Sequence, residues 1–131
     1  MREILFRAKR HKDYGEGWVY GVPFVDYAGD CIMKDNATER VVDPDTVGQY
    51  TGLTDKNGTK IFEGDVVHMN SRKFGLSGHG LVVYRNGSFA IDDRKRNRLY
   101  PFMQNGQYNA VDYRVYGNVH DNPELLEVRN G

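Results

Sequence analysis

The sequence predicts a mainly β protein, and three observations support this. No window of the chain keeps helical periodicity over the roughly 10–12 residues that a confident helix needs. Short segments in which apolar and polar residues alternate recur instead. The chain also contains 15 glycines and 9 tyrosines, a composition that suits short strands joined by tight turns.

Two alternating segments near the N-terminus, residues 3–9 and 18–25, predict a β-hairpin. Every second residue of each segment is apolar, which places two sets on single strand faces: Ile4, Phe6 and Ala8, and then Trp18, Tyr20, Val22 and Phe24. Pro23 has no N–H for a ladder. The second strand is therefore expected to lie at a sheet edge or to bend at this residue.

Turn chemistry marks the next part of the chain. Residues 31–34 predict a short strand, and Asp43-Pro44-Asp45 predicts a single helical turn, because proline is tolerated at the first helical position. Asn57 or Gly58 can take positive φ, which predicts a turn before a strand at 60–62. A strand at 66–69 follows, and residues 70–80 are expected to form a loop.

Asn86-Gly87 gives the strongest hairpin signal, since this dipeptide is preferred in two-residue type I′ turns. Such a turn pairs Arg85 with Ser88 and continues to Val82 opposite Ile91. The expected core wall on one face consists of Val82, Tyr84, Phe89 and Ile91.

The C-terminal part predicts one more strand and one helical turn. Residues 92–110 are polar around the apolar segment 99–102, and the last strand is expected at 113–119. Asp121-Asn122-Pro123-Glu124 then combines a capping residue, a proline in the first turn and an acidic side chain that complements the helix dipole.

Several of these segments resemble one known family. The stretches are 1–8 (MREILFRA), 17–21 (GWVYG), 47–58 (VGQYTGLTDKNG), 61–67 (IFEGDVV) and 116–126 (YGNVHDNPELL). In this order they resemble the YopX family of bacteriophage and prophage proteins, with Ala8 standing where the family pattern predicts glycine. The resemblance implies an SH3-like small barrel, a phage-derived gene and no established biochemical activity. It places the barrel region at 48–131, with its strands ending near residue 121, and an N-terminal β element at 1–47. The alternative is that the two regions form one integrated domain.

Composition excludes several classes of function. Hydrophobic residues are 39% and charged residues 27% of the chain, which disfavours wholesale disorder. The 18 basic and 18 acidic residues cancel, so no chain-wide field attracts nucleic acid or acidic lipid. No apolar run approaches the roughly 20 residues that span a bilayer. The single cysteine and the absence of a signal-peptide pattern predict a reducing cytoplasm and no membrane partner. The family resemblance implies that this is the cytoplasm of a bacterial host cell.

The inventory of reactive groups predicts a non-enzymatic protein without metal or cofactor. The four histidines, His11, His68, His79 and His120, lie in separate segments and do not form a zinc motif. Cys31 lacks a recognisable nucleophile context. The acidic stretch around Asp55 and Asp65 lacks the spacing of a Ca²⁺ loop, and its carboxylates are interpreted as turn and cap residues.

One stretch indicates binding. Residues 66–98 contain seven basic side chains against two acidic ones, Asp92 and Asp93. Clustered basic residues neutralise phosphates, and a neighbouring aromatic ring stacks on an exposed base. The candidate nucleic-acid-binding residues are Arg72, Lys73, Arg94, Lys95, Arg96, Arg98 and Tyr100. The two aspartates weaken the local field, and charge runs are usually solvated faces.

Two functions therefore remain open. The favoured hypothesis is a phage or prophage accessory protein that binds another macromolecule or itself without catalysing a reaction. The strand edge expected near Pro23 favours homo-oligomers formed by strand addition, whereas no residue pattern specifies a protein partner. The alternative is a nucleic-acid-binding protein that uses the basic loop at 94–98.

Overall fold

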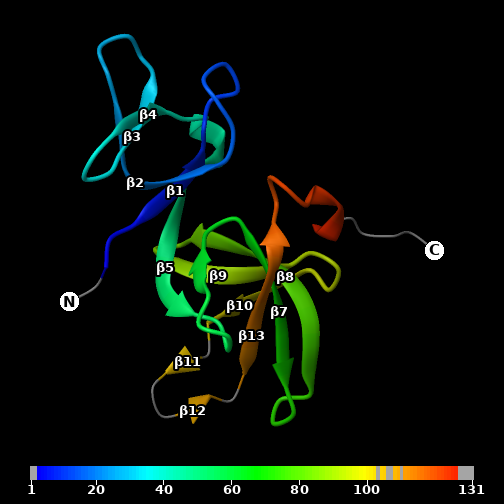
Figure 1. Cartoon of the computed structure of the whole chain (residues 1–131). Helices are drawn as coiled ribbons and strands as arrows, with labels where there is room; N and C mark the ends of the chain where they lie inside the picture. The colour runs from blue at the N-terminus through cyan, green and yellow to red at the C-terminus, as the bar shows by residue number, and fades with distance from the viewer. Residues whose placement is uncertain (1–2, 103, 106–107, 110, 127–131) are drawn as a thin grey trace. The chain divides into compact units, whose positions relative to one another are not determined.

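The computed structural model describes residues 3–102, 104–105, 108–109 and 111–126 (Figure 1). The described residues are mainly β, and most strands belong to two antiparallel sheets, which confirms the predicted class. The chain forms two compact units, Met1–Gly52 (unit 1) and Leu53–Gly131 (unit 2). No helix in the described ranges is long and apolar enough to cross a membrane.

Unit 1 contains the predicted N-terminal hairpin. Its strands are β1 (Phe6–Lys9), β2 (Trp18–Val25), β3 (Cys31–Lys34), β4 (Glu39–Val41) and the start of β5 (Gly48–Thr54), in the sheet order β4-β3-β2-β1-β5. The pairing of β1 with β2 confirms the hairpin. The predicted helical turn is η1 (Pro44–Thr46), where the Asp43 side chain accepts a hydrogen bond from the Asp45 N–H at 3.0 Å.

Strand β2 changes its ladder partner midway. Its residues 18–21 pair with β1, and its residues 22–25 pair with β3. Pro23 thus lies where β1 has already ended, as expected for a residue that cannot donate to a second ladder. Gly21 marks the change of partner, because a Cβ at this position would collide with the backbone carbonyl oxygen of Lys34.

The alternating apolar face of β2 is largely exposed. Tyr20, Val22 and Phe24 are 46%, 53% and 41% exposed, whereas Val19 on the opposite face is buried. The core of unit 1 is correspondingly small and consists of Ala8, Val19, Met33 and Val42, with Phe6, Cys31 and Val47 packed against it. We call Tyr20, Val22 and Phe24 the β2 stripe.

Unit 2 is built around a five-stranded antiparallel sheet. Its strands are β7 (Asp65–Ser71), β8 (Leu76–Arg85), β9 (Ser88–Asp93), β10 (Arg98–Pro101) and β13 (Asp112–Asn118), in the order β10-β9-β8-β7-β13. The other elements are β6 (Lys60–Phe62), a ribbon of β11 (Gln104–Asn105) and β12 (Tyr108–Asn109), and η2 (Pro123–Leu126), which confirms the predicted C-terminal helical turn. The predicted last strand corresponds to β13.

The hairpin at Asn86-Gly87 has the predicted register, from Arg85 opposite Ser88 to Val82 opposite Ile91. The φ angles of Asn86 and Gly87 are 53° and 83°, as a type I′ turn requires. Val82 and Ile91 are buried, as predicted for the core wall.

The prediction that Tyr84 and Phe89 belong to the core wall is wrong. Tyr84 and Phe89 meet, with ring centroids 5.0 Å apart, but Tyr84 is 52% exposed. The buried cluster of unit 2 includes the Val82–Ile91 pair and not the Tyr84–Phe89 pair, which lies nearer the turn. The alternating pattern correctly predicted which residues share this face of the sheet. The prediction that the core extends along the face as far as Tyr84 and Phe89 was too long.

The expected loop at 70–80 is also wrong. Strand β7 continues to Ser71 and β8 begins at Leu76, so only residues 72–75 form the connection.

The ladders of the described residues do not close into a barrel, and the SH3-like barrel stays a prediction. The division into 1–47 and 48–131 likewise stays a prediction about folding units.

Asp55 fixes the turn that belongs to the family motif. Its buried side chain accepts backbone N–H bonds from Asn57 and Thr59, both at 2.9 Å, and from Val115 of β13 at 3.0 Å. Burial opposes ionisation of this carboxyl, but the three N–H donors and nearby Arg114 outweigh it and lower the pKa of Asp55. The motif aspartate therefore joins the β5–β6 turn to the sheet of unit 2.

Candidate nucleic-acid interface

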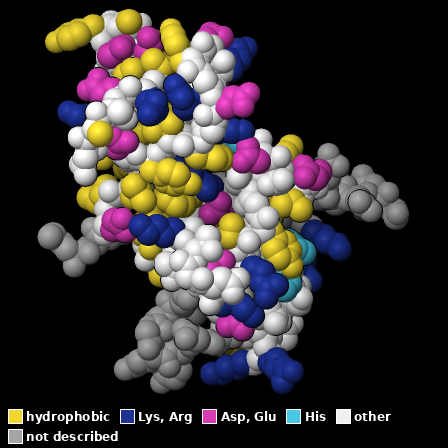
Figure 2. Space-filling view, viewed as in Figure 1, with side chains coloured by type: hydrophobic (Ala, Val, Ile, Leu, Met, Phe, Trp, Pro, Cys, Tyr) yellow, Lys and Arg dark blue, Asp and Glu magenta, His cyan; other side chains and the backbone are white. Residues whose placement is uncertain are grey.

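The predicted basic residues lie in two turns of unit 2. Arg72 and Lys73 belong to the β7–β8 turn, and the residues from Arg94 to Arg96 belong to the β9–β10 turn. Arg98 begins β10. All six basic side chains are exposed, and Tyr100 is half-buried against the core. Figure 2 shows Lys and Arg side chains at the end of the β7–β8 hairpin and, higher on the same face, beside the His side chains.

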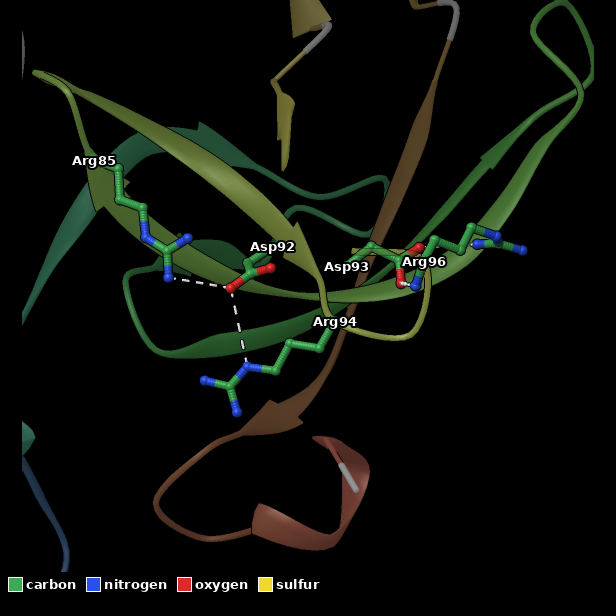
Figure 3. Close-up of polar contacts among 5 residues, drawn as sticks. All are labelled: Arg85, Asp92, Asp93, Arg94 and Arg96. Atoms are coloured by element: carbon green, nitrogen blue, oxygen red, sulfur yellow. Dashed lines mark hydrogen bonds and ion pairs between the residues drawn. The ribbon is translucent and has the colours of Figure 1, made fainter. Parts of the chain in front are cut away.

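Asp92 and Asp93 pair with this basic turn on opposite sides of β9 (Figure 3). Asp92 Oδ2 lies 3.2 Å from Arg85 Nη2 and 3.9 Å from Arg94 Nε. The buried Asp93 accepts hydrogen bonds from the backbone N–H of Arg96 at 3.1 Å and from its Nη1 at 2.9 Å. The aspartates therefore weaken the field, as predicted, and Asp93 also orients Arg96.

Arg96 joins the β9–β10 turn to the start of strand β8. Its Nη2 donates to the backbone carbonyl of Ser77 in β8 at 2.8 Å. Gly78 leaves the room for this contact, because a Cβ there would collide with Arg96 Nη1. The guanidinium is thus held by one carboxylate and one carbonyl, and it forms part of the wall of a groove.

That groove has a volume of about 490 Å³. We call it the basic groove, and its lining residues are Phe74, Gly75, Leu76, Ser77, Arg96, Arg98 and Tyr100. Of the described residues that line it, two are arginines, two are aromatic and none carries a carboxylate. Its chemistry therefore favours a ligand that combines negative charge with a flat apolar surface.

The structure brings together only part of the predicted site. Arg96, Arg98 and Tyr100 line the basic groove. Lys73 lies beside it, with its Nζ 5.7 Å from the centroid of the Phe74 ring. Sequence reasoning missed Phe74 because residues 70–80 were expected to form a loop. The signal was Gly75, because a connection of three to five residues that contains a glycine is typical of a hairpin.

A second cleft of about 500 Å³ contains Arg94 and Lys95 together with residues that sequence reasoning treated as scattered. His68 and His79 face each other across β7 and β8, and their ring centroids are 5.1 Å apart. They alternate with core residues of β7, which places them on the outer face of the sheet. Tyr116 stacks on His68 with the ring centroids 5.7 Å apart.

Arg114 of β13 completes this row, because it lies opposite His68 in the ladder. Partial burial lowers the pKa of His68, and the charges of His79 and Arg114 lower it further. A bound anion would oppose this effect by favouring the charged imidazole. The outer row therefore adds Arg114 and a titratable imidazole, whose neutral form is favoured, beside a cleft that Asp92, Asp93 and Glu124 also line.

Cys31 lies half-buried at the start of β3 and packs against the core of unit 1. Burial raises the pKa of its thiol, which disfavours the thiolate that a nucleophile requires. Within the described part of the chain, no group of three or more His, Cys, Asp or Glu side chains is placed to hold a metal ion.

A family model described as YopX protein matches residues 22–127. The chain belongs to the YopX family. The matched range contains both the Asp55 turn and the basic groove, and it confirms the family resemblance seen in the sequence motifs.

Two crystal structures are similar to this YopX-family chain. Protein EF1440 from Enterococcus faecalis is 24% identical with a TM-score of 0.56, and protein yopX from Bacillus subtilis is 21% identical with a TM-score of 0.58. Each comparison covers 97% of this chain and 100% of the other. At these identities the likeness shows the fold alone. Among curated proteins, no sequence matches the chain significantly.

Proposed function

We propose that this YopX-family protein is a non-enzymatic binding module and that its macromolecular partner is a nucleic acid. The observation that carries the proposal is the contact between Arg96 and the Ser77 carbonyl, which brings the β9–β10 turn to the β7–β8 hairpin. Two basic turns that are separate in sequence thereby contribute to one surface. Family membership supports a role as an accessory protein of a phage or prophage in the bacterial cytoplasm.

The free charges on this surface supply the affinity. Arg72, Lys95 and Arg98 form no ion pair with the described residues, and Lys73 contacts only the Phe74 ring there. Each phosphate that such a side chain neutralises releases a counterion. Four contacts predict a slope of log Kobs against log salt of roughly −3 for single strands.

The test is fluorescence anisotropy of a labelled oligonucleotide with the full chain across a salt series. Binding should be strongest at the lowest salt, because electrostatic contacts are screened least there. Replacing Lys95 and Arg98 together by Gln should reduce the slope by about 1.4. The matched control is Lys12→Gln, at an exposed lysine in a turn of unit 1. Absence of binding at the lowest salt would refute the proposal.

Self-association is a second candidate, and the β2 stripe favours it. Three large apolar side chains on one strand face are exposed, next to the end of β2 that has only β3 as a ladder neighbour among the described strands. Exposed apolar area of this kind often marks an interface. Sedimentation should show a concentration-dependent dimer that Val22→Thr combined with Phe24→Ser disrupts. A monomer at high concentration argues against it.

A further inference from the structure

We infer that the nucleic acid is single-stranded and that the basic groove takes one unpaired base onto the face of Phe74. This inference rests on the proposed function and concerns the same surface. It assigns different tasks to the groove residues: Phe74 stacks, Arg98 contacts phosphate, and Arg96 is a positioning residue that shapes the wall.

Phe74 is the unusual residue in this surface. It is 55% exposed although it stands in a tight turn among cationic neighbours. The turn is ordered by its own hydrogen bonds, from the Phe74 N–H to Ser71 Oγ at 3.2 Å and from the Gly75 N–H to the Arg72 carbonyl at 3.4 Å. The backbone that carries the ring is therefore ordered before binding, and little backbone entropy is lost when a base stacks on the ring.

The other wall of the groove is packed against the core. Tyr100 packs against the core cluster of unit 2, and Leu76 does the same from β8. The volume of about 490 Å³ lies within the range of roughly 300–1,000 Å³ typical of small-molecule sites. The groove thus offers a pre-formed apolar space beside an aromatic ring.

The charges fit a phosphodiester beside that base. Arg96 is held by Asp93 and the Ser77 carbonyl, whereas Arg98 forms no ion pair with the described residues. The described residues that line the groove include no carboxylate, and the neighbouring Asp93 is buried and paired with Arg96, so Arg98 is the lining cation left to meet a phosphate. An aromatic platform beside cationic side chains is the arrangement that binds unpaired bases with little sequence preference.

A duplex would use this site poorly. Paired bases are stacked on one another, so their faces cannot reach Phe74, and a duplex would contact the cations alone. Among the described residues that line the groove, none is an Asn, Gln or carboxylate side chain that could read base edges. The expected ligand is therefore a single strand of almost any sequence.

Anisotropy with three probes of equal length tests this: oligo(dT), the corresponding duplex, and a single strand that is abasic throughout. At one low salt concentration, oligo(dT) should bind roughly 5- to 150-fold more tightly than the abasic strand, which is the range for one stacked base. Phe74→Leu should remove most of this difference without weakening the abasic complex. Phe74→Trp should restore it.

The matched control is Tyr84→Leu, because Tyr84 is a similarly exposed aromatic residue in the β8–β9 hairpin that does not line the groove. This variant should bind all three probes like the unaltered chain. Equal binding of all probes, or Phe74→Leu without effect, overturns the stacking inference and leaves the proposed function standing. Failure of every probe to bind at the lowest salt overturns both.

Discussion

In unit 1, strand β2 exposes its alternating large apolar side chains to solvent. In unit 2, strands β7 to β9 bury alternating apolar side chains in the core. The same two-residue period therefore leads to opposite outcomes. Alternation determines which side chains share a face, and the layer that covers a face determines whether it is buried. Exposed apolar residues consequently favour different kinds of ligand in the two units. The β2 stripe is a purely apolar surface, whereas Phe74 is surrounded by cationic side chains.

The largest expected effect concerns burial itself. Ile91→Ala in unit 2 should lower the free energy of unfolding by about 2–5 kcal/mol, because it leaves a cavity in a fully buried cluster. Val22→Ala in the β2 stripe should change it by about 0.5 kcal/mol or less. Urea unfolding followed by circular dichroism measures both. Equal losses at the two positions would show that the stripe is buried in solution.

A smaller loss is expected at the motif turn. Asp55→Asn keeps one acceptor oxygen but turns an NH₂ group toward one of the three N–H donors, which should cost about 1–3 kcal/mol at neutral pH. Because the pKa of Asp55 is lowered in the folded state, its contribution is complete above the unfolded value near 3.9 and is lost as pH falls through the folded pKa.

Acid titration of stability checks this second prediction. The unaltered chain should lose stability below about pH 4 more steeply than Asp55→Asn, which has no carboxyl to protonate. Asp45→Asn is a suitable control because Asp45 is an exposed carboxylate in unit 1. Parallel acid curves for Asp55→Asn and the unaltered chain would contradict the role of Asp55.

Local turn chemistry explains how much of the fold the sequence predicts. Asn86-Gly87 sets the register of one hairpin and Asp43-Pro44-Asp45 starts one helical turn, because both signals act within a few residues. The connection at 72–75 escaped prediction because Arg72, Lys73 and Phe74 are not turn formers and the glycine follows them. Because that hairpin was not predicted, two features that depend on its register were not predicted either: the position of Phe74 and the His68–His79 pair.

The candidate site shows the same limit. Arg96, Arg98 and Tyr100 are neighbours in sequence and were predicted together, and the structure keeps them together. Phe74 and the His68–His79 pair join them only through the register of β7 with β8. Contacts of this kind come from ladder pairing over distance in the chain, which one sequence without its pairing does not specify.

The smallest expected effect lies on the outer face of unit 2. Partial burial, His79 and Arg114 lower the pKa of His68, so the unfolded chain takes up its proton first as pH falls. Stability should therefore decrease as pH falls through the unfolded value of about 6.5. Urea midpoints at pH 7.5 and 5.5 should differ less in His68→Gln than in the unaltered chain. An equal difference would exclude His68 as the cause.

The most direct measurement is an amide chemical-shift titration of the full chain with oligo(dT) at low salt. If unit 2 provides the binding surface, residues 72–77 and 94–100 should shift with a common affinity, and residues 18–25 of the β2 stripe region should not. Shifts confined to residues 18–25, or no shifts at any oligonucleotide concentration, would contradict the assignment of nucleic-acid binding to the basic groove.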